Sequence, residues 1–149
     1  MRVLLVEDHA IFRELFATAF ERETGVEVVA QAGSLAEAGE KLDELSGGVD
    51  VAVVDLGLPD GDGTDLIGEL RANNPHAVAL VLTASFDPSS HARAVAAGAA
   101  GILHKSSSIE TVMDAMRRLS SGEVLLSQKE VIELLRLADR ERTLAREAK

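Results

Sequence analysis

Short apolar runs alternate with stretches of helical periodicity along this 149-residue chain, and this alternation limits the fold more than any other feature. The apolar runs predict five strands, at residues 2–6, 26–32, 51–54, 78–82 and 101–103. The periodic stretches predict five helices, near residues 10–23, 35–45, 64–73, 89–97 and 108–121. Five strand–helix units in succession favour a parallel sheet with helices on both faces. We therefore expect a doubly wound α/β domain with a five-stranded parallel sheet.

Residues that favour helix ends lie at several of the expected boundaries. Ser34 and Ser107 each precede a glutamate by three residues, which is the spacing of a capping box. Asp87 is an N-cap type of residue and is followed by a proline at the first helical position. Gly98 lies where the fourth helix should end. These residues support the predicted order of elements.

Charge and cysteine content restrict the classes of function. The formal net charge is −10, and the first 127 residues contain nine basic and twenty acidic side chains. This balance argues against binding of a nucleic-acid backbone by the main body and suits a site that holds a cation. The chain has no cysteine, which excludes disulfides, thiolate zinc sites and thiol nucleophiles. With no apolar run of signal-peptide or membrane-spanning length, the sequence predicts a soluble cytoplasmic protein without membrane contact.

Polar residues follow four of the predicted strands. Glu7 and Asp8 come after the first, Asp55 after the third, Thr83 after the fourth and Lys105 just beyond the fifth. Ligands of such sheets bind beyond the carboxyl ends of the strands, so these side chains should meet at one edge. Clustered carboxylates repel one another unless a cation lies between them, and oxygen ligands favour Mg²⁺. With a hydroxyl and an ammonium group nearby, the arrangement suits transfer of a phosphoryl group to an aspartate.

Four motifs in this order resemble the response-regulator receiver domain, the CheY-like fold. "VLLVEDH" resembles its first strand and acidic pair, "VVDLGLPDGDG" its phospho-acceptor loop, "VLTAS" its switch strand and "GILHKSSS" its lysine loop. The resemblance covers residues 1–122 and implies a flavodoxin-like (βα)5 domain. The segment "VMDAMRRLSSGEVLLSQKEV" resembles the last helix and linker of LuxR/NarL-type regulators, which usually end in a helix-turn-helix domain.

The resemblance implies a phosphorylation site and a metal site. Asp55 would accept the phosphoryl group from a histidine kinase, a phosphotransfer protein or a small acyl phosphate. Asp8 and Asp55 would bind Mg²⁺ directly, Glu7 would assist through water, and Gly57 would supply its backbone carbonyl. The domain would be a signalling component of a two-component system, assisting its own phosphorylation and dephosphorylation rather than acting as an enzyme.

The resemblance also implies a switch. Thr83 and Lys105 would contact the phosphoryl oxygens, and inward movement of Thr83 would bias the face formed by residues 84–107. Phosphorylation would then control homodimer formation and, through a further domain, transcription. Candidate interface positions lie on the fourth and fifth predicted helices: Arg93, Val95, Met113, Met116 and Arg117.

Two other functions stay open at this point. Ile102 stands where many receivers carry a switching Tyr or Phe, which leaves room for a receiver-like interaction module that is not phosphorylated. Residues 60–64 spell DxDGT, the nucleophile motif of haloacid-dehalogenase-type phosphatases. That chemistry places its first aspartate directly after an apolar strand, whereas here the strand is followed by Asp55. We therefore interpret Asp60 as part of a turn.

Residues 123–149 are predicted to form a linker and a C-terminal helix outside the receiver domain. Ser127 precedes Glu130 by three residues, another capping-box spacing, and residues 131–138 favour a helix on a solvated tail. The 22 residues after Ser127 are too few for a helix-turn-helix domain. DNA contact is therefore expected only through an output domain outside these residues, and both a truncated regulator and a chain that ends at residue 149 fit the sequence.

Overall fold

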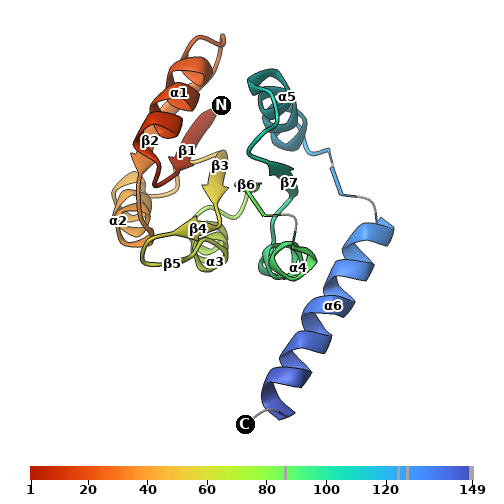
Figure 1. Cartoon of the computed structure of the whole chain (residues 1–149). Coiled ribbons are helices and arrows are strands. Elements are labelled where there is room, and N and C mark those ends of the chain that lie inside the picture. Colours follow the sequence, from red (N-terminus) through yellow and green to blue (C-terminus); the bar gives the residue numbers. More distant parts are fainter. Residues whose placement is uncertain (86, 124, 127, 148–149) are drawn as a thin grey trace.

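The protein was analysed as a computed structural model, which describes residues 1–85, 87–123, 125–126 and 128–147. Its centre is a five-stranded parallel sheet in the order β2-β1-β3-β6-β7 (Figure 1). The strands are β1 (Arg2–Val6), β2 (Glu27–Ala32), β3 (Val51–Asp55), β6 (Val78–Thr83) and β7 (Gly101–His104). The five predicted strands are confirmed, each to within one residue at either end.

Helices cover both faces of this sheet (Figure 1). One face is covered by α1 (Ala10–Glu21) and α5 (Ile109–Ser120), and the other by α2 (Leu35–Leu45), α3 (Thr64–Asn73) and α4 (Pro88–Ala97). Phe16, Phe20 and Met116 fill the first core, whereas Leu42 and Ile67 belong to the second. The central strands β3 and β6 are apolar up to their last residues because both of their faces are packed. The predicted doubly wound α/β fold is confirmed.

N-cap side chains explain where several helices begin. The Ser34 hydroxyl accepts the Glu37 N–H at 3.1 Å, and Asp87 accepts the Ser89 N–H at 3.0 Å. The cap predicted at Ser107 is wrong by one residue. Its N–H donates to the His104 carbonyl in the turn after β7, so the cap falls on Ser108, which accepts the N–H of Thr111. The capping box predicted at Ser127 lies outside the described residues.

A small antiparallel hairpin lies between β3 and α3 and was not predicted. It consists of β4 (Gly57–Leu58) and β5 (Gly61–Asp62), which pair with each other and stand apart from the main sheet. Two-residue strands are too short for a periodic apolar pattern, so sequence periodicity cannot reveal them. The hairpin turns the chain away from the end of β3 and leaves that edge open.

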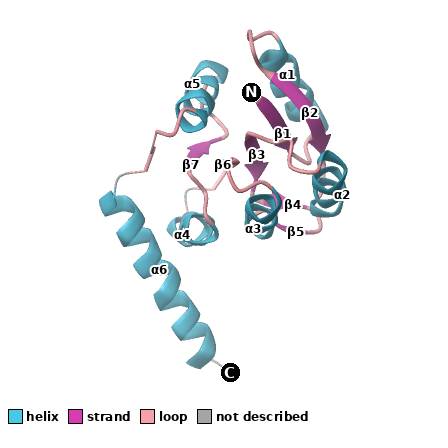
Figure 2. Ribbon diagram, turned by 180° about the vertical axis from the view of Figure 1, so that it is seen from behind, coloured by secondary structure: helices cyan, strands magenta, loops and turns pink. Residues whose placement is uncertain are grey.

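The last helix, α6 (Gln128–Glu147), lies beside α4 at the end of the molecule farthest from α1 (Figures 1 and 2). The helix was predicted, but its position was not: instead of standing in solvent, it buries Ala138 against the rest of the chain. Leu144, near the C-terminal end of α6, is 58% exposed, so not all apolar residues of this helix are covered. No helix in the described ranges has the length and apolarity needed to cross a bilayer.

Three of the positions considered for a dimer interface are corrected by this fold. Val95 is buried under α4, and Met113 and Met116 belong to the core beneath α5. The apolar residues of α5 recur at helical spacing along one side of the helix, and this pattern places Met113 and Met116 in the core rather than at the surface. Arg93 and Arg117 do reach the surface, where they form ion pairs with other parts of the chain.

Candidate functional site

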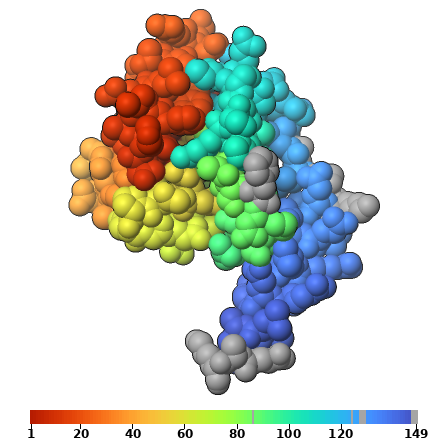
Figure 3. All heavy atoms as spheres, viewed as in Figure 1, coloured from red at the N-terminus to blue at the C-terminus, as the bar shows by residue number. Residues whose placement is uncertain are grey.

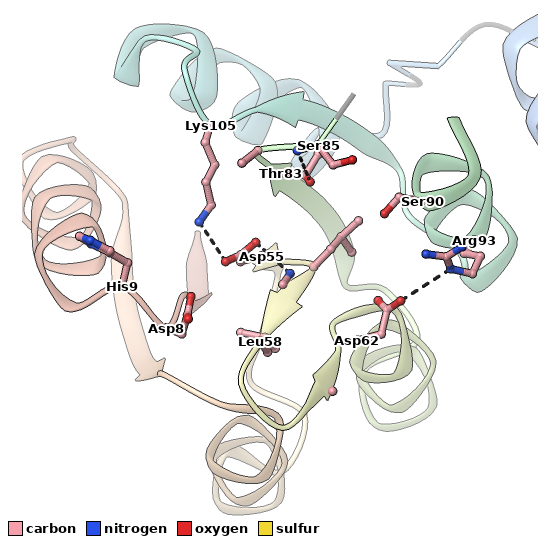
Figure 4. A pocket seen from close by; sticks show the side chains of 14 residues that line it. Asp8, His9, Asp55, Leu58, Asp62, Thr83, Ser85, Ser90, Arg93 and Lys105 are labelled. Atoms are coloured by element: carbon pink, nitrogen blue, oxygen red, sulfur yellow. Dashed lines mark hydrogen bonds and ion pairs between the residues drawn. The ribbon is translucent and has the colours of Figure 1, made fainter. Parts of the chain in front are cut away.

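A pocket of about 650 Å³ opens at the carboxyl ends of β1, β3 and β6 (Figure 4). Parallel strands bring their carboxyl ends to the same edge, so residues distant in sequence meet there. Asp8, Asp55, Thr83 and Lys105 all line this pocket, as the order of the strands predicted. The hairpin forms one wall, and Ser90 and Arg93 from the first turns of α4 form another.

Asp55 is the last residue of β3 and its carboxylate is held on both oxygens. Only 5% of the residue is exposed, because the surrounding strands bury it. Lys105 Nζ donates to Oδ2 at 2.9 Å, and the Gly57 N–H donates to Oδ1 at 3.1 Å. These two bonds fix the carboxylate in a single orientation at the base of the pocket.

Lys105 bridges Asp55 and Glu7. Its Nζ donates to Glu7 Oε1 at 2.8 Å and lies 5.4 Å from the centre of the Phe12 ring, so both sides of the ammonium group are held. Burial alone would lower the pKa of Lys105, but the hydrogen bonds to Glu7 and Asp55 outweigh it and raise that pKa above its ordinary value. The lysine is therefore a fixed positive charge at the site.

Glu7 shows that negative charge is crowded here. Burial raises the pKa of Glu7 above its ordinary value; the bond from Lys105 opposes this shift, and the neighbouring Asp55 adds to it. One Lys105 ammonium thus serves two buried carboxylates. The site has unbalanced negative charge, which a further cation would neutralise.

The chain offers ligands for such a cation. Carboxylate oxygens of Glu7, Asp8 and Asp55 lie within 4.8 Å of one another. Asp8 is exposed at the pocket, whereas Glu7 and Asp55 are buried. A set made only of carboxylate oxygens suits a hard divalent ion such as Mg²⁺. The Gly57 amide lies against Asp55, so this residue is also at the edge of the cluster.

Thr83 occupies the end of β6, but its hydroxyl is engaged away from Asp55. The residue is 4% exposed and lines the pocket, and Oγ1 accepts the N–H of Ser85 at 3.1 Å. Ser85 in turn accepts the N–H of Asp87 through its own hydroxyl at 3.0 Å. Thr83 is thus tied to the loop that enters α4.

Asp60 lies away from the site. Its carboxylate oxygens accept the N–H groups of Leu35 at 2.8 Å and Ala36 at 3.0 Å, at the start of α2. These bonds, led by the one from Ala36, lower the pKa of Asp60. The aspartate that opens the DxDGT motif is therefore a helix-capping group in a hairpin turn, which disfavours the phosphatase interpretation.

Arg93 is the functional candidate whose place the sequence did not reveal. It was considered only as a surface residue, yet it lines the pocket and lies 3.7 Å from Asp62 through its Nε (Figure 4). Figure 4 shows Lys105 and Arg93 on opposite sides of Asp55. Arg93 lies in the second turn of the helix that follows β6, so the residues directly after the strands do not include it.

Comparison with known proteins identifies the family. The family model of the response regulator receiver domain matches residues 3–117. The DNA-binding transcriptional activator DevR/DosR of Mycobacterium tuberculosis is 30% identical over 135 residues, which are 91% of this chain and 61% of that protein. The nitrate/nitrite response regulator protein NarP of Escherichia coli is 32% identical over 128 residues, 86% of this chain and 59% of that protein. The chain thus spans about three fifths of the length of these relatives.

Solved structures agree with this. A LuxR-family two-component response regulator from Aurantimonas sp. superposes with a TM-score of 0.73 at 29% identity, covering 95% of this chain and 97% of that one. The isolated REC domain of RcsB from Salmonella enterica, solved with the phosphomimetic BeF₃⁻, gives a TM-score of 0.74 at 25% identity, covering 91% and 98%. The resemblance drawn from the motifs is confirmed: the chain belongs to the response regulator receiver domain family, and its relatives include LuxR-family two-component regulators.

Proposed function

We propose that this receiver domain accepts a phosphoryl group on Asp55 in a Mg²⁺-dependent reaction. The observation that carries the proposal is the Asp55 carboxylate, buried and oriented at the base of an open pocket, bonded to Lys105 and bordered by two further carboxylates. The donor would be a phosphohistidine of a histidine kinase or phosphotransfer protein, or a small acyl phosphate.

The chemistry follows from the groups present. A carboxylate oxygen of Asp55 attacks phosphorus while the bond from phosphorus to the donor breaks, and the electron pair of that bond leaves with the donor. The product is an aspartyl phosphate, which water can later cleave to restore the carboxylate. Lys105 offers a fixed positive charge to the transferring oxygens, and the Thr83 hydroxyl, whose oxygen accepts the Ser85 N–H, would donate its O–H to them. Glu7, Asp8, Asp55 and the Gly57 carbonyl would hold the ion.

A bound Mg²⁺ would neutralise charge on the phosphoryl oxygens and on the carboxylates around them. The residues present fit that role, because their carboxylates cluster within ligand distance while a single lysine balances two of them. In this proposal residues 1–122 form the phospho-accepting receiver and residues 123–149 the linker and C-terminal helix. Phosphorylation would control homodimer formation and, through an output domain, transcription.

The test is the intact mass of the protein after incubation with acetyl phosphate. The mass should increase by one phosphoryl group when Mg²⁺ is present, and the increase should be absent with EDTA or in Asp55→Asn. The variant keeps the shape of the side chain but removes the nucleophilic oxygen. A wild-type mass that stays unchanged under all conditions would favour a receiver-like module that is not phosphorylated.

A further inference from the structure

The C-terminal helix α6 is connected to the site through α4. Figure 3 shows the α6 atoms beside those of α4 and extending past them. Leu134 of α6, with Leu126 and Glu130, lines a second pocket of about 260 Å³, which Thr83 and Ser85 also line. Both Thr83 and Ser85 line the Asp55 pocket as well. The end of β6 therefore lies between the candidate site and a cavity that α6 helps to form.

Glu141 of α6 makes polar contacts with two residues of α4. The Ser89 hydroxyl, in the first turn of α4, donates to Glu141 Oε1. Arg93, one turn further along, places Nη1 3.9 Å from Glu141 Oε2. Ala138 is buried one turn before Glu141, so the polar contacts lie next to the apolar seam between the helices. Glu141 thus fixes the position at which α6 lies on α4.

Arg93 joins this contact to the Asp55 pocket. Its guanidinium pairs with Asp62 on the hairpin and with Glu141 on α6, and the side chain lines the pocket. A phosphoryl group on Asp55 would add a charge of about −1.5 to −2 to that pocket. Arginine binds phosphate oxygens through parallel N–H donors, so such a group would compete with Glu141 for the guanidinium.

A chain of hydrogen bonds provides a second connection. The Thr83 hydroxyl accepts from Ser85 N, the Ser85 hydroxyl accepts from Asp87 N, and the Asp87 carboxylate accepts from Ser89 N. Ser89 then donates to Glu141. Movement of the Thr83 side chain toward a phosphoryl oxygen would carry Oγ1 away from Ser85 N, which would weaken the first bond of this series and loosen the loop that positions Ser89.

We propose that α6 covers the α4 face in the unphosphorylated protein, held by Ser89, Arg93 and Glu141, and that phosphorylation of Asp55 loosens this contact. The inference rests on the proposed function, because it needs a phosphoryl group at Asp55. It makes the α4 face an interaction surface whose occupant in the resting state is the chain's own C-terminal helix. Release would expose that surface.

Hydrogen exchange followed by mass spectrometry of the full chain tests the contact. Glu141→Ala removes both polar contacts without introducing a poor helix former, and Glu133→Ala is the matched control because Glu133 is an exposed glutamate of the same helix. We expect amides of residues 130–146 to exchange about three- to tenfold faster in Glu141→Ala, and to be unchanged in Glu133→Ala.

Acetyl phosphate and Mg²⁺ test the connection to the site. The phosphorylated wild type should exchange as fast in α6 as Glu141→Ala, and phosphorylated Glu141→Ala should show no further increase. The intact mass of each sample is measured in parallel. A modified wild type whose α6 exchange is unchanged would overturn this inference alone, and so would unchanged exchange in Glu141→Ala. A mass that shows no modification would overturn the proposed function together with it.

Discussion

Asp55 and Asp60 are only five residues apart, yet the aspartate at the end of β3 and the aspartate in the following hairpin have opposite environments. Asp55 is buried, is bonded to Lys105 and faces a pocket. Asp60 is exposed and accepts two backbone N–H groups from the start of α2. The position of each aspartate relative to the sheet decides its role, because only the strand end delivers a carboxylate to the shared edge.

The two environments have different physical consequences. At the end of β3, carboxylates are crowded and desolvated, and the raised pKa of the neighbouring Glu7 reports that burial. In the hairpin, backbone donors favour the ionised form and lower the pKa of Asp60. Crowding suits the binding of a cation and a phosphoryl group, whereas the hairpin environment suits a helix cap.

The largest effect should come from Lys105→Met. Loss of the ammonium group removes the charge that faces the phosphoryl oxygens, so phosphorylation by acetyl phosphate should slow by about 100-fold. It also leaves two buried carboxylates without their partner, which should lower the free energy of unfolding by about 3 kcal/mol without divalent ions. Lys41→Met, at a half-buried lysine of α2 that also forms an ion pair, is the control for both measurements. Wild-type phosphorylation in Lys105→Met would contradict the role assigned to the strand-end region.

The second largest effect is expected for Gly63→Ala, at the point where the end of the hairpin packs against the end of β3. A Cβ at Gly63 would meet the main-chain oxygen of Asp55 and the Val54 side chain. We expect a loss of about 2–3 kcal/mol in chemical denaturation and slower phosphorylation, because the end of β3 must shift. Gly68→Ala on α3 is the matched control: its Cβ would meet nothing within 4 Å, so it should stabilise by up to about 1 kcal/mol. Equal effects of Gly63→Ala and Gly68→Ala would contradict the close packing of Gly63 against Asp55 and Val54.

Glu7→Gln tests whether the carboxylates at the end of β3 are crowded and desolvated. Because burial raises the pKa of Glu7, the folded state binds more protons than the unfolded state between the ordinary and the raised pKa. Without divalent ions, the stability of the wild type should therefore fall as pH rises through that window, relative to Glu7→Gln. Denaturation curves over a pH series measure this, with the exposed Glu14→Gln as control. If the stabilities of wild type and Glu7→Gln changed with pH in the same way, the pKa of Glu7 would not be raised by folding.

The smallest effect is expected for Asp60→Ala. It removes the acceptors of the Leu35 and Ala36 N–H groups, so thermal stability should decrease while phosphorylation stays at the wild-type rate. The pKa of Asp60 is lowered, so its contribution is present above the ordinary aspartate pKa and is lost as pH falls through the lowered value. Asp43→Ala, an exposed aspartate of α2, is the control. Slower phosphorylation in Asp60→Ala, with wild-type phosphorylation in Asp43→Ala, would show that Asp60 also takes part in the site.

The site at the strand ends was predictable from the sequence, whereas the docking of α6 on α4 was not. Apolar runs locate strands, and parallel strands must bring Asp55, Thr83 and Lys105 to one edge whatever the loops do. The burial of Met113 and Met116 could also have been predicted, because the apolar residues of α5 recur every three or four positions on one side of the helix. The pairing of distant surface residues, in contrast, is invisible to local patterns.

The docking of α6 on α4 is the clearest example. Glu141 lies 52 residues from Ser89, and neither residue has a local feature that indicates the other. Only the folded chain brings them together. The same holds for the hairpin between β3 and α3, whose two-residue strands fall below the length at which alternation can be recognised.

Locating the phosphoryl group within the chain tests the central claim most directly. After acetyl phosphate and Mg²⁺, reduction with borohydride converts an aspartyl phosphate into homoserine, and trypsin then releases the peptide of residues 42–71, which contains Asp55 and Asp60. Fragmentation of this peptide should place homoserine at position 55. Homoserine at position 60, or a peptide that carries none although the intact mass has increased, would contradict the account.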